Sequence, residues 1–275
     1  MRTDGWEVLQ VSVEGDGRIV LVELDHGKAN EMGSAALRDF EALSAELQQD
    51  DRAVALITWS RRVSSKGTPI FVAGADVTER GDWSDDRVKA HVRWQRQVLT
   101  ALREAPVFHV GVVGGVALGW GTEYLLVCDY RIAVPGAVFG LPETGLGILP
   151  GAGGTAHLWQ HVGTAQALRL GMTGERIKGE EAERIGLVQE RATSLEAGLE
   201  RARTLAGLVA RNSPTAVAAF KSALLGAVGG AEAREAEACA YERCVDAGEA
   251  AIGRAHFADI RRGARAPWGP KRLED

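Results

Sequence analysis

The sequence has few cysteines, no long apolar run and no excess of positive charge, and each of these absences excludes a class of protein. Three cysteines among 275 residues cannot all pair and show no metal-ligand spacing, so we expect reduced thiols in a cytoplasmic protein. No apolar stretch approaches the roughly 20 residues of a membrane-spanning helix. The first residues lack the apolar segment of a signal peptide. A net charge of −5 argues against nucleic-acid binding, because phosphate contacts need a basic surface.

Several short catalytic motifs are also missing. Residues 145–150 depart from the dinucleotide-binding pattern at its last glycine, and no Gly-Lys-Thr/Ser phosphate motif occurs. No serine stands in the G-x-S-x-G turn of a serine hydrolase. His157 and His161 have the i, i+4 spacing of a metal-binding pair, but no third ligand is evident near them. We therefore expect no metal site.

What is present is typical of an α/β protein. The hydrophobic share of 45% and the charged share of 25% are those of an ordinary soluble globule. Strand and helix patterns alternate up to about residue 195, which predicts an α/β core over residues 1–195. Strands are expected at residues 8–13, 19–24, 54–59, 69–73, 107–113, 130–134, 137–139 and 186–188, and core helices at 34–49, 88–103, from 150 toward 161, and 180–185. 

Residues 196–275 read as a helical C-terminal region. Helical patterns cover residues 195–211, 217–225, 231–245 and 250–260, and Ser213 followed by Pro214 marks a helix start. This region is too small and too apolar-striped to be a free domain. We expect it to pack on the core or on a neighbouring subunit.

Residues 106–155 contain two glutamates framed by glycine-rich turns. The run at 114–121 places flexible backbone ahead of an apolar helical pattern, with Glu123 in the first turn, where the helix dipole favours a carboxylate. Glu143 follows a short strand twenty positions later. Two such carboxylates suggest paired acid/base chemistry. The alternative is that one caps a helix and the other is solvated.

Five motifs in order resemble the crotonase superfamily, and most closely its enoyl-CoA hydratase branch. They are FVAGADV at 71–77, ALGWGTE at 117–123, CDYRIA at 128–133, FGLPE at 139–143 and PGAGGT at 150–155. The resemblance runs in unbroken order from about Val11 to Trp268. It implies a crotonase-like spiral of ββα units with a C-terminal helical extension. It also implies an acyl-CoA thioester substrate.

The resemblance assigns roles to four residues of this stretch. The backbone N–H groups of Ala75 and Trp120 would form an oxyanion hole for the thioester carbonyl. Fixed amide donors of this kind are worth roughly 3–4 kcal/mol each as enolate charge develops. Glu123 would chiefly activate water for attack at the β-carbon, and Glu143 would chiefly exchange a proton at the α-carbon. The family shares both tasks between the two carboxylates.

The resemblance also places coenzyme A, which arrives as part of the substrate rather than as a separate cofactor. Lys221 stands where the family often supplies a basic contact to its phosphates, although a solvated helix lysine is an equal alternative. Asp76 and Asp129 are expected to make structural capping and turn hydrogen bonds. The residues expected along coenzyme A are Lys28, Ala29, Ala73, Gly74, Asp76, Val77 and Lys221.

Trp120 departs from the family pattern, which usually has glycine there. We expect Trp120 to adopt an ordinary negative φ, because tryptophan at positive φ would be strained by roughly 1 kcal/mol or more. Its indole should pack in or near the acyl pocket, since packing beneath the glycine turn would need a ready-made cavity in a tight core.

Alternatives to hydration remain open at this point. The same oxyanion hole could serve isomerisation, C–C cleavage or thioester hydrolysis, and a catalytically idle homologue could simply bind acyl-CoA. The resemblance further implies a homotrimer or a dimer of trimers. Apolar residues of the helical region should then be buried by the core or by a neighbouring subunit, namely Phe220, Leu224, Leu225 and Phe257.

Overall fold

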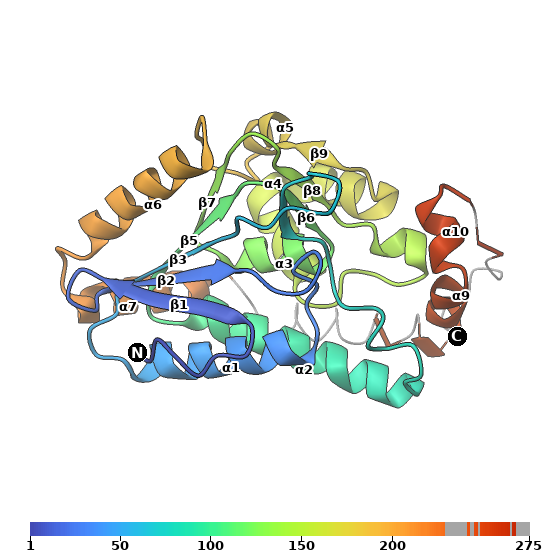
Figure 1. The fold of residues 1–275 in the computed structure, drawn as a ribbon, viewed down its shortest axis with the longest axis horizontal. Helices are drawn as coiled ribbons and strands as arrows, with labels where there is room; N and C mark the ends of the chain where they lie inside the picture. Colours follow the sequence, from blue (N-terminus) through green and yellow to red (C-terminus); the bar gives the residue numbers. More distant parts are fainter. Residues whose placement is uncertain (229–240, 243–244, 247, 265, 268–275) are drawn as a thin grey trace.

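A computed structural model describes residues 1–228, 241–242, 245–246, 248–264 and 266–267. Its described part contains two β-sheets with helices packed around them (Figure 1). The predicted helix at 231–245 lies almost entirely outside the described residues, as do Cys239, Cys244 and Trp268. The α/β architecture predicted from the sequence is confirmed.

The larger sheet has six strands in the order β1-β2-β3-β5-β7-β10. An antiparallel hairpin, β1 (Leu9–Glu14) and β2 (Ile19–Leu24), forms one edge, with the predicted glycine turn between its strands. The remaining strands run parallel to β2: β3 (Ala55–Trp59), β5 (Phe108–Val113), β7 (Tyr130–Ala133) and β10 (Glu190–Arg191). Residues 186–188, predicted as a strand, precede β10 instead, because Gly186 turns the chain at φ +87°.

The smaller sheet has the order β4-β6-β8-β9. Its first three strands, β4 (Ile70–Val72), β6 (Val116–Leu118) and β8 (Val138–Gly140), are parallel, and β9 (Ile177–Lys178) is antiparallel to β8. The sequence analysis missed β6 because its three residues lie between glycines. Parallel pairing aligns the C-terminal ends of β4, β6 and β8, and this edge carries the candidate site.

Three helices enclose the main core. The helix α1 (Ser34–Gln49) has the predicted bounds, and α2 (Asp85–Glu104) begins at Ser84, whose hydroxyl accepts from the N–H of Arg87. Both helices lie below the larger sheet in Figure 1. The short helix α3 (Trp120–Val127) is buried along its whole length, which explains why it carries almost only apolar residues apart from Glu123 and Thr122.

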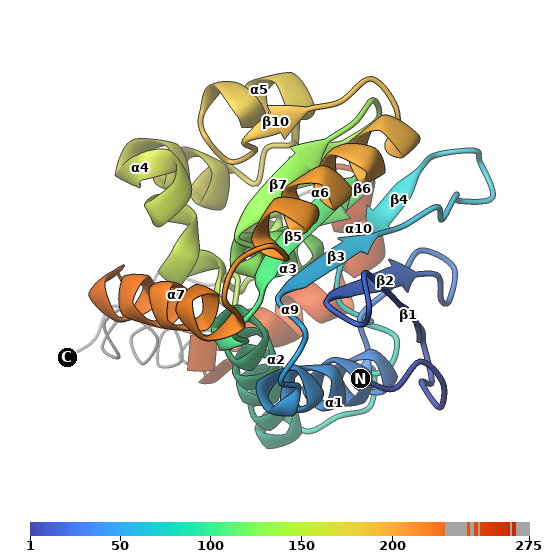
Figure 2. The same ribbon diagram turned by 90° about the vertical axis from the view of Figure 1, so that its left-hand side faces the viewer.

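Later helices cover the remaining faces. The helix α4 (Gly154–Thr173) bends at Gly163, whose φ is +74°, and α5 (Gly179–Arg184) follows β9. The helix α6 (Leu195–Val209) packs on β3, β5 and β7 (Figure 2). Its buried residues, including Leu199 and Ala202, join a second core cluster with Val110 and Val112. The first helix of the C-terminal region is thus part of the core packing.

The last helices are α7 (Pro214–Val228), α9 (Glu249–Ala255) and α10 (Phe257–Arg261). The Ser213 hydroxyl accepts from the N–H of Ala216, so the predicted cap before Pro214 is present. The predicted helix at 250–260 is split at His256. Within this chain Phe220 is 73% exposed and Leu224 is 52% exposed, while Phe257 is half-buried. The core alone therefore does not bury the apolar face of α7.

Candidate active site

Three parallel strands deliver the candidate residues to one edge of the smaller sheet. Ala75 follows β4, Trp120 follows β6, and Glu143 follows β8. Register pairs Val72 with Ala117 and Leu118 with Gly140, so the three segments leave the sheet side by side. The topology thus brings together residues that are 68 positions apart in the sequence.

The backbone N–H groups of Ala75 and Trp120 are not donated to any group among the residues that the structure describes. The next helical residue explains how the two segments come so close. A Cβ on Gly121 would lie 2.3 Å from the carbonyl oxygen of Val72, so only glycine lets α3 begin against the end of β4. Two unpaired amides at adjoining strand ends are suited to bind one carbonyl oxygen.

Trp120 adopts the predicted negative φ, because the positive φ falls on Gly119 at +53°. Its side chain packs into the main core. The indole is 2% exposed and belongs to the main core cluster, 5.9 Å from the ring of Phe40 and 5.6 Å from that of Tyr124 between ring centroids. The space between α1 and α3 accommodates the ring, and a place for the indole in or near the acyl pocket stays a prediction.

Glu123 is held in place by the segment that opens α4. Its Oε1 accepts from the N–H groups of Ala152 at 2.7 Å and Gly154 at 3.0 Å, and its side chain is buried. Gly153, at φ +124°, gives this segment its shape. Sequence reasoning did not identify these donors, although the PGAGGT run at 150–155 was the available signal. The two N–H groups fix the direction of the carboxylate.

Glu143 begins a short 3₁₀-helix, η1 (Glu143–Leu146), and lies over the glycine turn of β6. A Cβ on Gly119 would lie 2.5 Å from Oε1 of Glu143, which places this carboxyl beside the Trp120 amide. Its Oε2 has no hydrogen-bond partner among the described residues. Burial raises the pKa of Glu143 to about 7. The group can therefore hold or release a proton near neutral pH.

Two loops meet beside this edge and bring most of the expected coenzyme A residues together. The N–H of Ala73 donates to the carbonyl of Ala29 at 3.1 Å, and that of Asp76 donates to Met32 at 2.9 Å. Lys28 is exposed next to this contact. Asn30, which sequence reasoning did not single out, fastens the loop because its side-chain amide donates to Leu24, Ser60 and Phe71.

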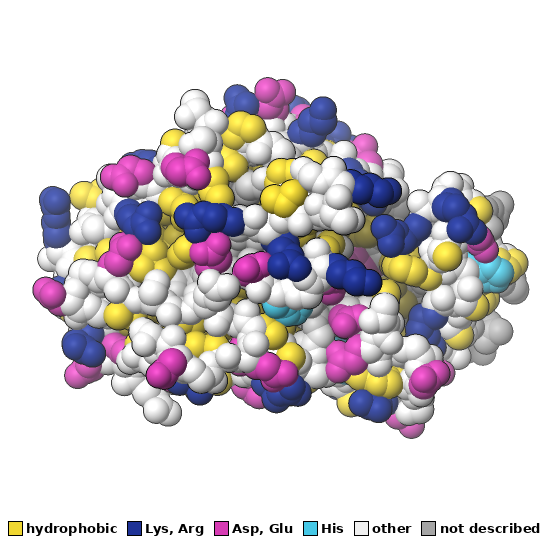
Figure 3. Space-filling view, in the orientation of Figure 1, with side chains coloured by type: hydrophobic (Ala, Val, Ile, Leu, Met, Phe, Trp, Pro, Cys, Tyr) yellow, Lys and Arg dark blue, Asp and Glu magenta, His cyan; other side chains and the backbone are white. Residues whose placement is uncertain are grey.

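The neighbouring turn supports the structural interpretation of Asp76. Its Oδ1 accepts from the hydroxyl of Thr78 at 2.6 Å, from the N–H of Thr78 at 2.9 Å and from that of Glu79 at 3.2 Å. Burial raises the pKa of Asp76, but these hydrogen bonds, that of the hydroxyl most of all, lower it further. An open groove of about 250 Å³ lies alongside. It is lined by His26, Glu31, Gly33, Ser34, Ala35, Arg38, Asp76 and Glu79. Figure 3 also shows a hollow between the main body and the lobe formed by α9 and α10, with Lys and Arg side chains on both sides.

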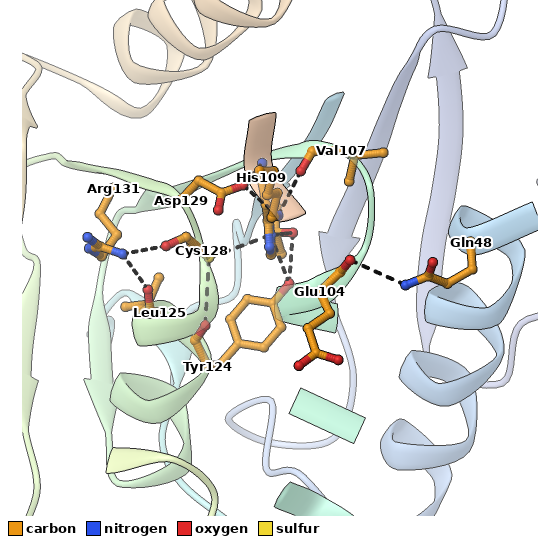
Figure 4. Close-up of polar contacts among 11 residues, drawn as sticks. Gln48, Glu104, Val107, His109, Tyr124, Leu125, Cys128, Asp129 and Arg131 are labelled. Atoms are coloured by element: carbon orange, nitrogen blue, oxygen red, sulfur yellow. Dashed lines mark hydrogen bonds and ion pairs between the residues drawn. The ribbon is translucent and has the colours of Figure 1, made fainter. Parts of the chain in front are cut away.

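Lys221 lies apart from these loops. Its ammonium donates to the carbonyl of Val107 and to Oδ2 of Asp129, both at 2.8 Å, and the side chain is buried. The alternative of a solvated lysine is therefore wrong, and a phosphate contact would require the ammonium to leave these partners. Asp129 also accepts from the N–H of His109 at 2.7 Å, which confirms its structural role (Figure 4).

Among the described residues, no group of three or more His, Cys, Asp or Glu side chains could hold a metal ion, so His157 and His161 do not form part of such a group. His161 is bound on one side by Arg131, 3.1 Å from Nδ1, and on the other by the carbonyl of Leu126. Burial lowers the pKa of His161 to about 3, so the ring is neutral. Across the described residues, no helix combines the length and apolarity that a membrane span requires.

Known proteins resemble this chain in sequence and in fold. The family model described as enoyl-CoA hydratase/isomerase matches residues 14–263. A short-chain-enoyl-CoA hydratase of Clostridium acetobutylicum is 35% identical over 221 residues, which are 79% of this chain and 82% of that protein. The solved structure of DspI from Pseudomonas aeruginosa is 31% identical with a TM-score of 0.75, covering 94% of this chain and 97% of that one. An enoyl-CoA hydratase structure from Bacillus anthracis is 30% identical, with a TM-score of 0.72 over 94% and 98%.

Proposed function

Because the chain belongs to the enoyl-CoA hydratase/isomerase family, we propose that it is a hydratase that adds water across the 2,3-double bond of an enoyl-CoA thioester. The observation that carries this proposal is the meeting of two unpaired backbone amides with two buried glutamates at one sheet edge. Hydration needs these parts: donors for the thioester oxygen, a base for water and an acid for the α-carbon.

The amides of Ala75 and Trp120 bind the thioester carbonyl oxygen. As water attacks C3, negative charge moves through C2 onto that oxygen, and the two donors stabilise the enolate. Each donor contributes roughly 3–4 kcal/mol in a site from which water is excluded. Because the donors are fixed by glycine turns at the ends of β4 and β6, little reorganisation is needed during the reaction.

The two glutamates divide the proton transfers. Glu123, oriented by the N–H groups of Ala152 and Gly154, accepts a proton from water as its oxygen bonds to C3. Glu143 delivers a proton to C2, a task supported by its raised pKa of about 7. The hydroxyl ends on C3 and the new hydrogen on C2. A proton then returns to Glu143 from solvent, and Glu123 loses the one it took.

Coenzyme A runs past the two joined loops in this proposal. Lys28, the exposed residue before Ala29, supplies a cation beside their contact, and the Ala29 to Ala73 hydrogen bond fixes the shape of the surface. The substrate's own coenzyme A is the only such group required. Lys221 contributes to this site only if it exchanges its present partners for a phosphate.

We also propose that the chain assembles as a homotrimer or a dimer of trimers. Two faces support an interface between copies, because apolar side chains of α4 and α7 are exposed in this chain. They are Trp159, Leu168, Met172, Phe220 and Leu224.

The proposed activity is tested with crotonyl-CoA and the purified full-length protein. We expect the absorbance of the conjugated thioester to fall and a product heavier by one water to appear in mass spectra. The absence of both changes, while the saturated analogue butyryl-CoA still binds, would refute hydration. It would favour isomerisation, C–C cleavage, thioester hydrolysis or simple acyl-CoA binding instead.

A further inference from the structure

Several polar atoms of buried side chains near Glu123 have no hydrogen-bond partner among the described residues. Arg80 is 8% exposed, and its Nε and Nη2 have no hydrogen-bond partner among the described residues. The same holds for Nε2 of His91, which is 7% exposed, and Nε2 of Gln95, which is 3% exposed. Buried polar atoms normally have partners, so several in one region indicate that a bound molecule supplies them.

The position of these side chains relates them to the candidate active site. His91 and Gln95 are one turn apart on the buried face of α2, which also carries Val92. Val92 packs on Gly151, where an added Cβ would come within 2.7 Å of it. The next residue, Ala152, donates its N–H to Glu123. This face of α2 therefore adjoins the segment that orients the carboxylate of Glu123.

Arg80 approaches the same place from the turn after β4. It stands five positions beyond Ala75, and its guanidinium interacts electrostatically with Tyr241, Glu79, Asp76 and Glu123, in decreasing order. Tyr241 in turn interacts with both catalytic candidates, Glu123 and Glu143. Through Glu123 the guanidinium adjoins the reacting end of the candidate site, and Glu79 and Asp76 of the turn after β4 also act on it.

Charge distinguishes Arg80 from its neighbours. No salt bridge of Arg80 is present among the described residues, although an arginine stays protonated at all ordinary pH values. Burial lowers the pKa of His91 to about 4, so this ring is neutral and adds no second charge. A buried guanidinium that has carboxylates near it but no direct ion pair, and two nitrogens without hydrogen bonds, is costly, and a carboxylate bound through two parallel hydrogen bonds would remove that cost.

We propose that the enzyme acts on acyl-CoA thioesters whose acyl chain ends in a carboxylate, and that Arg80 binds this carboxylate. The Gln95 amide and the His91 ring supply further polar contacts to the same group. This inference rests on the proposed hydratase function and adds the substrate class. Arg80 is then a specificity-determining residue, because it binds the substrate at the end remote from the reacting carbons.

The test compares two substrates that differ only in the terminal group, crotonyl-CoA and glutaconyl-CoA. We expect the wild-type kcat/KM to be at least about tenfold higher for glutaconyl-CoA. Arg80→Met should lower that value by about a hundredfold and change the value for crotonyl-CoA by less than about threefold. Arg80→Lys should retain part of the preference, because it keeps the charge but loses the two-pronged geometry. Arg203→Met is the control. It removes an arginine of α6 that is paired with Glu14 of β1, and it should change neither value.

Binding of the saturated analogues glutaryl-CoA and butyryl-CoA, measured by calorimetry, separates this inference from the proposed function. If wild type hydrates neither enoyl substrate but binds glutaryl-CoA more tightly, and Arg80→Met abolishes that difference, hydration fails and the carboxylate site stands. Equal wild-type use of both enoyl substrates overturns the inference, even if no Arg80 variant folds. Equal slowing of both substrates by Arg80→Met also overturns it, because the guanidinium would then serve Glu123.

Discussion

Replacing Gly119 by alanine should damage both catalysis and folding, and the loss of catalysis should exceed what backbone strain alone causes. The new Cβ would lie 2.5 Å from Oε1 of Glu143, whereas ordinary contact begins at 3.4 Å, so the carboxylate must move by about 0.9 Å (3.4 − 2.5). The atom that yields is the end of a flexible side chain, which keeps the structural cost low. The alanine also inherits φ +53°, a strain of about 1–3 kcal/mol. A displacement near 1 Å at a proton-transfer group costs about a hundredfold in rate.

The assay is kcat/KM for crotonyl-CoA alongside thermal unfolding. Two controls separate the contributions. Gly67→Ala carries a positive φ of +79° with nothing within 4 Å, so it should lose stability but keep its activity. Gly145→Ala lies in η1 with open space and no positive φ, so it should change neither quantity. Full turnover by Gly119→Ala would refute the placement of the Glu143 carboxyl over this turn.

Three further predictions follow from which side chains are buried and which are exposed. The pKa of Glu143, raised from 4.5 to about 7, means that the unfolded chain ionises first, so stability is lost as pH rises from about 4.5 to 7. In denaturant titrations, Glu143→Gln should therefore be more stable than wild type by about 3 kcal/mol at pH 8 and equal to it near pH 4. Equal stability of the two proteins at both pH values would contradict this. Trp120→Ala should destabilise the fold by about 3–5 kcal/mol and leave unchanged the order in which the enzyme prefers acyl chains of different length. A changed order would show that the indole borders the acyl chain. Light scattering should show a trimer or hexamer, and Phe220→Ser with Leu224→Ser should weaken it; a stable wild-type monomer at micromolar concentration would disprove the interface.

Local patterns account for most of the fold. The strand at 19–24 and the helix at 34–49 have the bounds that their apolar spacing predicts, and Ser213 caps the helix that begins at Pro214. The equally short strands β4 and β8 were predicted, but β6 was missed because its three residues lie between glycines, although it forms the centre of the site. Short elements of this kind are defined by their neighbours in the sheet and not by their own residues.

The site was predictable where backbone chemistry decides and not where packing does. The glycines around Trp120 indicated free amides, and its negative φ followed from the strain that tryptophan would suffer otherwise. The direction of its indole depended on the space beside Phe40, which no local pattern encodes. Lys221 is similar, because its partner Asp129 is 92 positions away. The raised pKa of Glu143 likewise arises from burial that only the folded chain provides.

The central claim is that Glu123 and Glu143 act together on water and the α-carbon at an amide-lined carbonyl site. The most direct measurement is the hydration rate of crotonyl-CoA by wild type, Glu123→Gln and Glu143→Gln, with butyryl-CoA affinity measured in parallel. Each glutamine keeps the shape of the side chain but removes its proton chemistry. We expect each variant to lose about 10²–10⁴-fold in kcat while binding butyryl-CoA nearly as wild type does. Full turnover by either variant would contradict the role assigned to that residue.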